Sequence, residues 1–240
     1  MEKNEPIRVL NFVPNMRAAG IESFIMNVYR NIDKSKIQFD FVVHNKRREF
    51  FDDEIEKLGG KIYRLTYKDD KNIFKYIKDL NDFFKDHKEY KIVHGHMQSM
   101  MPLYLYIAKK YNVQARIAHS HNGSYEKTLK GFVLHLFSRF SKYPANYYMA
   151  CSEVAGKYLF GNKDFKILYN GIDIDKFKFN EDIRNKYRKD LKLEDNFVIG
   201  HIGRFELQKN HKFILEIFND FQKEKSSAKL LLVRRRKTKK

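Results

Sequence analysis

Four histidines stand in two pairs, each at the end of a predicted strand. The segments VHGHM and AHSHN place His94 and His96, then His119 and His121, at spacing i, i+2. Because side chains alternate along a strand, the members of each pair point to the same side. Such histidines hydrogen-bond a substrate hydroxyl, ligate a metal or are simply packed. No acidic or cysteine ligand follows at a fixed spacing and no HExxH motif occurs. The pattern therefore favours substrate binding over a metal site.

A second group of polar residues lies in the segment HIGRFELQKNH, residues 201–211. A predicted strand ends there, Gly203 turns the chain, and Arg204 and Lys209 follow before His211 opens a helix. Two cations and a helix N-terminus beyond a strand form a suitable cradle for a diphosphate. The alternative is a solvated basic loop.

A third candidate is Gly20, in the segment PNMRAAGIESF after the first predicted strand. A helix that begins at Gly20 offers free backbone N–H groups to an anion. The segment lacks the GxGxxG pattern of dinucleotide-binding loops, so an ordinary strand–helix turn stays open as the alternative.

The elements that must position these residues alternate between short apolar runs and longer amphipathic segments. We predict strands at residues 7–13, 39–44, 61–65, 91–96, 115–121, 147–152, 166–172, 197–203 and 228–233. We predict helices near residues 21–32, 52–59, 72–87, 103–110, 129–141, 153–160, 182–191 and 211–223. This alternation predicts an α/β fold with a parallel sheet covered by helices on both faces. The loop-like segment NGIDIDKFKFNED suggests a domain boundary.

The composition narrows the function classes. The 240 residues carry a net charge of +18, contain one cysteine, and include no long apolar stretch or signal peptide. A single cysteine excludes an internal disulfide and fits a reducing cytoplasm. The positive charge fits either a solvated lysine-rich surface or an anionic partner. No groove-reading or stacking motif points to nucleic acid.

Residues 126–143, EKTLKGFVLHLFSRFSKY, form an amphipathic segment. Large apolar side chains share one helical face, and the lysines and the arginine lie largely elsewhere. The apolar residues are Leu129, Phe132, Val133, Leu136, Phe137 and Phe140. Such a helix either packs on the sheet or rests on an anionic bilayer. Both readings stay open.

Taken together, the motifs resemble the family-4 retaining glycosyltransferases of the GT-B fold, especially those of capsular and exopolysaccharide synthesis. The matching segments are RAAGIESFIMNVYRNID, VHGHM, IAHSHN, ACSEVAGKYLFG, ILYNGIDIDKF and the Gly-Arg…Gln-Lys-Asn pattern at residues 203–210. The resemblance implies an N-terminal Rossmann-like domain that receives the acceptor and a second that holds a nucleotide-sugar such as a UDP- or GDP-sugar. It implies no cofactor and no metal.

The resemblance also assigns roles to residues. Gly20, Gly203, Arg204 and Lys209 would bind the donor diphosphate, while the catalytic candidates His96, His119 and His121 would face the acceptor or the transferring sugar. The acceptor would be a saccharide or a lipid-linked sugar, which would place the protein in the cytoplasm, peripherally at the inner membrane face. Ala19 stands where the family has glycine, which requires a negative φ at that position.

The expected domains are an acceptor-side domain at 1–175, a linker and helix at 176–195, an incomplete nucleotide-sugar-binding domain at 196–233, and an aberrant basic tail at 234–240. The family continues beyond the last strand and carries an acidic pair, Glu–x7–Glu, that contacts the donor. The sequence therefore predicts a truncated glycosyltransferase with reduced or no activity alone. The alternative is a non-catalytic basic protein that binds an anionic membrane surface or a partner chain.

Overall fold

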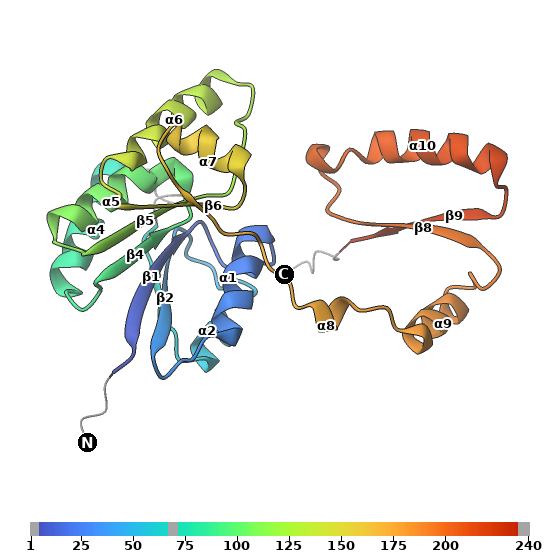
Figure 1. Ribbon diagram of the computed structural model, residues 1–240, viewed down its shortest axis with the longest axis horizontal. Helices are drawn as coiled ribbons and strands as arrows, with labels where there is room; N and C mark the ends of the chain where they lie inside the picture. The colour runs from blue at the N-terminus through green and yellow to red at the C-terminus, as the bar shows by residue number, and fades with distance from the viewer. Residues whose placement is uncertain (1–4, 67–71, 235–240) are drawn as a thin grey trace. The chain divides into compact units, whose positions relative to one another are not determined.

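A computed structural model describes residues 5–66 and 72–234, without the side chain of residue 208. The chain divides into two compact units, residues 1–173 and residues 174–240 (Figure 1). The sequence places the boundary at residue 175. The predicted basic tail lies outside the described residues except for Arg234.

Unit 1 is built on a seven-stranded sheet in which every neighbouring pair is parallel. The strand order is β3-β2-β1-β4-β5-β6-β7. The bounds are β1 Ile7–Val13, β2 Ile37–Val43, β3 Ile62–Arg64, β4 Ile92–Gly95, β5 Ala115–Ser120, β6 Tyr147–Ala150 and β7 Lys166–Ile167. The predicted parallel α/β fold is confirmed.

One strand prediction is wrong in length. Residues 166–172 are predicted as a strand, but β7 contains Lys166 and Ile167 only. The reason is local, since β7 is the edge strand and pairs with β6 alone. Tyr169 is 73% exposed, so an extended strand there would bury little apolar surface, and Asn170 and Gly171 favour a turn.

Helices cover both faces of the sheet in Figure 1. The helices α1 Gly20–Asn31 and α2 Asp52–Lys57 pack on one face. The helices α4 Ile73–Asp86, α5 Met101–Lys110 and α7 Glu153–Phe160 pack on the other, and the 3-10 turns η1 Gln98–Met100 and η2 Phe140–Lys142 flank α5 and α6 Leu129–Arg139. Each face has its own apolar core, centred on Phe41 and Tyr29 for α1 and on Phe12 and Tyr104 for α4 and α5.

Helix ends follow ordinary capping chemistry. The Asn72 side chain accepts a hydrogen bond from the Lys75 backbone N–H at 3.0 Å and caps α4. Gly59 follows α2 closely in the chain. Its backbone has a φ of +86°, a left-handed conformation that favours glycine. A Cβ at that position would also lie 2.7 Å from the Gln38 side chain.

Unit 2 is small. It contains α8 Ile174–Phe177, α9 Glu181–Asp190, β8 Phe197–Ile202, η3 Leu207–Lys209, α10 His211–Glu224 and β9 Ala228–Val233. The strands β8 and β9 pair in parallel as a two-stranded sheet. Among the described residues of this unit, Ala228 is the only buried hydrophobic residue. A two-stranded sheet with one amphipathic helix offers little volume in which to bury side chains.

Candidate functional site

The structure brings the four strand-end histidines of unit 1 into one group, here called the histidine cluster (His94, His96, His119 and His121). Because β4 and β5 are parallel neighbours, their carboxyl ends lie at the same sheet edge. His94 Nε2 lies 3.1 Å from His119 Nδ1, and His96 Nδ1 lies 2.9 Å from His121 Nε2. The ring centroids of His94 and His96 are 4.0 Å apart, and those of His119 and His121 are 4.2 Å apart. The predicted same-side placement is confirmed by these contacts.

Burial keeps the cluster neutral. His119 is fully buried and His96 is 2% exposed, whereas His94 and His121 are partly exposed. Burial, with smaller contributions from neighbouring rings, lowers the pKa of His94 to about 3 and that of His119 to about 2. Burial alone lowers the pKa of His121 to about 4, and burial above all holds the pKa of His96 well below its usual value. Neutral imidazoles donate one hydrogen bond and accept one.

Asn11 on β1 fixes which nitrogen of His96 carries the proton. The Asn11 amide nitrogen donates to the backbone carbonyls of Val9 and Asp40 at 3.2 Å and 3.3 Å. Its oxygen therefore faces His96 Nε2, at 3.4 Å, and accepts a hydrogen bond from it. His96 Nδ1 then carries a lone pair, which accepts from His121 Nε2–H.

The consequence reaches His121. With its proton on Nε2, neutral His121 carries a lone pair on Nδ1, which is enclosed and has no hydrogen-bond partner among the described residues. His119 Nε2 is enclosed and unpaired in the same sense. An unpaired buried polar atom costs about 1–3 kcal/mol, and each of these two enclosed nitrogens carries such a cost.

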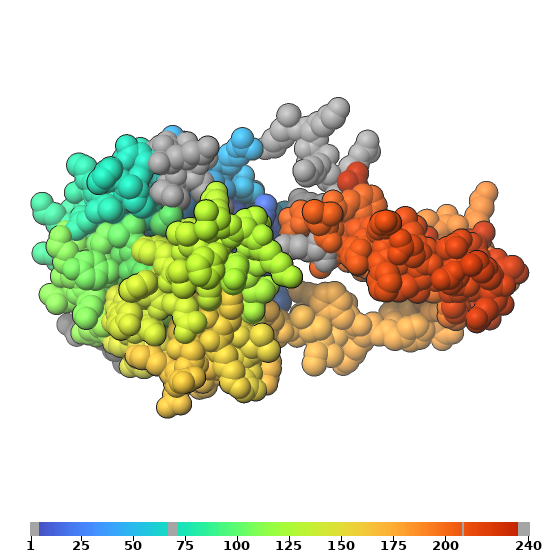
Figure 2. Space-filling view, turned by 90° about the horizontal axis from the view of Figure 1, so that it is seen from above, coloured from blue at the N-terminus to red at the C-terminus, as the bar shows by residue number. Residues whose placement is uncertain are grey.

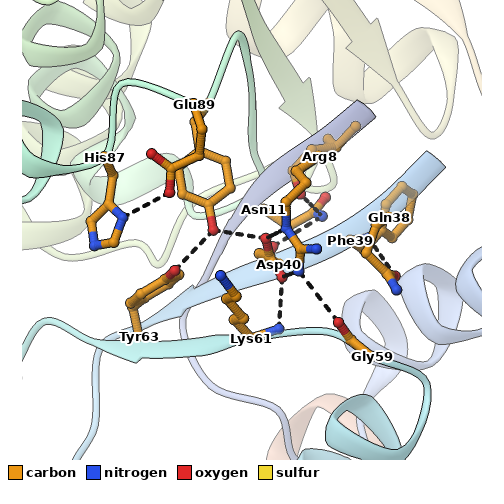
Figure 3. Close-up of polar contacts among 12 residues, drawn as sticks. Arg8, Asn11, Gln38, Phe39, Asp40, Gly59, Lys61, Tyr63, His87 and Glu89 are labelled. Atoms are coloured by element: carbon orange, nitrogen blue, oxygen red, sulfur yellow. Dashed lines mark hydrogen bonds and ion pairs between the residues drawn. The ribbon is translucent and has the colours of Figure 1, made fainter. Parts of the chain in front are cut away.

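Asn11 is itself held through the backbone carbonyl of Asp40, whose side chain belongs to a buried ionic group on the neighbouring strand (Figure 3). The Asp40 carboxylate is fully buried and accepts from Arg8 Nε at 2.5 Å and Arg8 Nη2 at 2.6 Å. It also accepts from the Tyr90 hydroxyl at 2.7 Å and from the Lys61 backbone N–H at 2.6 Å. Burial, chiefly, raises the pKa of Tyr90, so the phenol stays protonated and donates.

The N-terminus of α1 lies beside the cluster. The helix begins at Gly20, as predicted, and Phe24 one turn later places its ring 5.8 Å from the ring of His119 and 6.1 Å from that of His121. Ala19 has φ −141° and its side chain does not cap the helix, so alanine is accommodated without strain. A Cβ on Gly20 would meet nothing within 4 Å.

The cluster also has the spacing of a possible cation site. One ring nitrogen each from His94, His96 and His119 lies within 4.8 Å of the others. In the part of the chain that the structure describes, no carboxylate or thiolate joins this group. His96 offers no free lone pair to such an ion, because its Nδ1 accepts from His121 and its Nε2–H donates to Asn11.

In unit 2, the predicted diphosphate residues surround the turn between β8 and α10. Gly203 donates its N–H to Val233 O at 3.0 Å, and the Lys209 side-chain stem lies 3.4 Å from where a Gly203 Cβ would be. Arg204 Nη1 lies 3.0 Å from Glu206 Oε1 in an exposed ion pair, of a kind worth about 1 kcal/mol or less. Lys209 has no acidic partner among the described residues.

The same turn positions a helix N-terminus. Asn210 adopts a left-handed conformation, φ 44°, and its side chain does not cap α10. The His211 ring packs edge-on against Phe205 at 4.5 Å and near His201 at 5.1 Å. Sequence reasoning missed His201 and Asn11. His201 shares the strand-end position that identified the other histidines, whereas nothing local marks Asn11.

The unit 1 sheet, with helices on both faces and polar residues at its carboxyl edge, defines a Rossmann-like α/β unit. The Glycosyltransferase Family 4 model matches residues 18–176. The chain belongs to Glycosyltransferase Family 4.

Two curated relatives agree with this assignment. The chain is 31% identical over 219 residues to the putative glycosyltransferase EpsF of Bacillus subtilis (strain 168), covering 88% of this chain and 57% of that protein. It is 27% identical to the capsular polysaccharide biosynthesis glycosyltransferase CapH of Staphylococcus aureus, covering 91% of this chain and 59% of the relative. The chain thus spans less than two thirds of the length of these relatives.

Solved structures support the fold. Anabaena Alr3699/HepE in complex with UDP and glucose matches with a TM-score of 0.73 at 16% identity, over 94% of this chain and 60% of that one. The apo lipopolysaccharide outer core galactosyltransferase WaaB matches with a TM-score of 0.59 at 15% identity, over 94% of this chain and 60% of that one. At these identities the likeness establishes the fold.

Proposed function

We propose that this chain takes part in transferring a hexose, with retention, from a nucleotide-sugar such as a UDP- or GDP-sugar to a saccharide or lipid-linked acceptor in cell-surface polysaccharide synthesis. The observation that carries the proposal is the turn after β8. Arg204, Lys209 and the uncapped first turn of α10 all belong to the segment that follows this parallel strand. Family membership and the polysaccharide relatives support the reaction class.

The chemistry requires positive charge at the leaving group. When the sugar–phosphate bond breaks, negative charge builds on the nucleoside diphosphate, and fixed cations stabilise that charge. Arg204 offers a planar fork and Lys209 a mobile point charge for the phosphate oxygens. The weak Arg204–Glu206 ion pair leaves the guanidinium free to exchange partners.

The histidine cluster supplies hydrogen bonds in unit 1. His121 is the partly exposed member of the pair that it forms with buried His96. We assign His121 to a sugar hydroxyl, with His96 as a positioning residue that acts through it. Gly20, which has open space in front of its missing Cβ, lets a phosphate or sugar approach the α1 N-terminus. Catalysis would then take place in the cytoplasm, where nucleotide-sugars are available.

Calorimetric titration of the full chain with UDP and GDP tests the donor site. We expect Arg204→Ala and Lys209→Ala each to weaken nucleotide binding about 10- to 100-fold, as for a lost charge-assisted hydrogen bond. Lys223→Ala is the matched control, because Lys223 is 70% exposed in its side chain and lies in the last turn of α10, away from the proposed site. Equal affinities for the three variants, or no binding of either nucleotide at millimolar concentration, would contradict the proposal and favour the non-catalytic alternative.

A further inference from the structure

Helix α6 carries its apolar side chains on the outside. The large hydrophobic residues of this segment are between 39% and 81% exposed: Leu129, Phe132, Val133, Leu136, Phe137, Phe140 and Tyr143. The buried position of the helix is a serine, Ser138. On the inner side His135 stacks on Tyr158 at 4.2 Å. The six-residue apolar face predicted from the sequence therefore exists, but it does not pack on the sheet.

An open apolar pocket continues this face. It measures about 290 Å³ and lies between α5, α6 and η2, with Tyr106, Phe137, Phe140 and Tyr143 among its lining residues. The segment is lime-green in Figure 2, where its side chains form part of the surface of that view. A contiguous exposed apolar surface of this kind marks an interaction site.

The charge around the face is one-sided. Residues 97–152 contain seven basic residues and a single acidic one, Glu126. Lys127 and Lys130 are exposed at the start of α6. Lys142 Nζ lies 5.4 Å from the centroid of the Tyr143 ring, which places a cation at the rim of the pocket. Apolar side chains ringed by cations complement an anionic bilayer.

The face also follows the histidine cluster closely in the chain. Chain continuity places α6 eight residues after His121, since the helix begins at Leu129. The connection is tied to the sheet edge, because Asn122 donates to the Gln98 side chain at 3.0 Å and Gln98 donates to Ser120 at 2.8 Å. Within the described residues, no helix is long and apolar enough to cross a bilayer. Contact would therefore be interfacial.

We propose that α6, η2 and the adjoining pocket, here called the α6 face, rest on an anionic bilayer, with the pocket taking the hydrocarbon chain of a membrane lipid. Phe137 and Phe140 enter the region between headgroups and acyl chains, while Lys127, Lys130 and Lys142 contact anionic headgroups. In the setting of the proposed function, on which this part rests, a lipid-linked acceptor reaches the histidine cluster from this surface.

Co-sedimentation of the full chain with phosphatidylcholine vesicles, with and without phosphatidylglycerol, tests the proposal. We expect binding to the anionic vesicles that weakens between 50 mM and 500 mM salt. Phe137→Ser with Phe140→Ser should lower the partition coefficient about tenfold per side chain. Lys127→Glu with Lys130→Glu should lower it by about fivefold or more per residue.

Matched controls lie elsewhere on unit 1. Phe74→Ser removes an aromatic residue that is 81% exposed on α4, and Lys85→Glu with Lys88→Glu reverses two exposed lysines. Equal binding by the face variants and these controls would overturn the proposal. The proposal would also be overturned if the protein did not bind vesicles but instead self-associated or bound single-stranded nucleic acid, and if the face variants abolished that association.

The vesicle experiment and the nucleotide experiment can fail independently of each other. UDP binding is measured on the same variants, and we expect it to be unchanged. Vesicle binding without nucleotide binding refutes the glycosyltransferase proposal alone. Nucleotide binding without vesicle binding refutes the α6 face alone.

Discussion

Acidification should destabilise unit 1 through the histidine cluster. An unfolded histidine has a pKa near 6.5, whereas burial lowers the pKa of His121 to about 4 and that of His94 to about 3. Below pH 6.5 the histidines of the unfolded chain therefore bind protons, whereas the same histidines of the folded chain stay neutral. Stability rises with pH wherever the unfolded state binds more protons, so it must fall as the pH drops from 6.5 toward the folded values.

The magnitude follows from the shift. At pH 5, each cluster histidine that stays neutral contributes about 1.36 × 1.5, or roughly 2 kcal/mol, of lost stability. Four such histidines give an upper bound of about 8 kcal/mol, which is comparable to the whole stability of a typical domain, about 5–15 kcal/mol. The ion-paired carboxylates titrate lower: hydrogen bonds from Arg48, the largest cause, lower the pKa of Asp53 and of Glu56. Histidine protonation therefore accounts for most of the expected loss of stability between pH 6.5 and pH 5.

Urea unfolding of the full chain at pH 7, 6 and 5, followed by circular dichroism, measures this loss. His121→Asn should reduce the pH-dependent loss between pH 7 and pH 5 by about 2 kcal/mol, since one linked proton disappears. His87→Asn removes an imidazole outside the cluster and controls for the substitution itself. A free energy of unfolding that is constant from pH 7 to pH 5, or an unchanged slope in His121→Asn, would refute the neutral-cluster argument.

Three further predictions test the packing behind the site. Asn11→Leu should cost about 1–3 kcal/mol in urea unfolding, because His96 Nε2–H loses its acceptor, and long-range 1H–15N correlations of the imidazole rings should then report a mixture of tautomers instead of one. Asp40→Ala should cost about 3–5 kcal/mol, because it leaves Arg8 partly buried without its carboxylate; a loss below 1 kcal/mol in the same assay would contradict this. Gly156→Ala should destabilise by about 1–3 kcal/mol despite the better helix propensity of alanine, since its Cβ would lie 2.1 Å from the Phe165 ring, and thermal unfolding monitored by circular dichroism decides the sign.

The histidine cluster shows which part of a site can be predicted from sequence. Alternation along a strand predicts that His94 and His96 share a side, and a parallel sheet predicts that strand ends meet at one edge. Both are local rules. The bond between Asn11 and His96 joins residues 85 positions apart, and it exists because β1 pairs with β4. Strand order is a property of the whole sheet, so no local sequence pattern predicts the contact between Asn11 and His96.

Helix α6 shows a second limit. The 3.6-residue period identifies its apolar face correctly, but the period alone does not say what covers that face. The direction is set by tertiary contacts, in particular the stacking of His135 on Tyr158 and the burial of Ser138. Both are contacts that the amphipathic period does not encode. The strand prediction at 166–172 failed for a related reason, since an edge strand gains little from extension where its side chains are exposed.

The two units differ in the kind of polarity that they present, and each kind suits a different chemical group of the proposed substrates. A nucleotide-sugar joins a charged diphosphate to a neutral hexose. In unit 2, Arg204 and Lys209 present positive charge beside an uncapped helix N-terminus, which suits phosphate oxygens. In unit 1, burial keeps the histidines neutral, and a neutral imidazole pairs with hydroxyl groups as a donor or an acceptor. A charged histidine cluster would instead compete for the diphosphate, because a second cationic site attracts the same anion. The depressed pKa values are thus what the proposed division of roles requires of His121 at neutral pH.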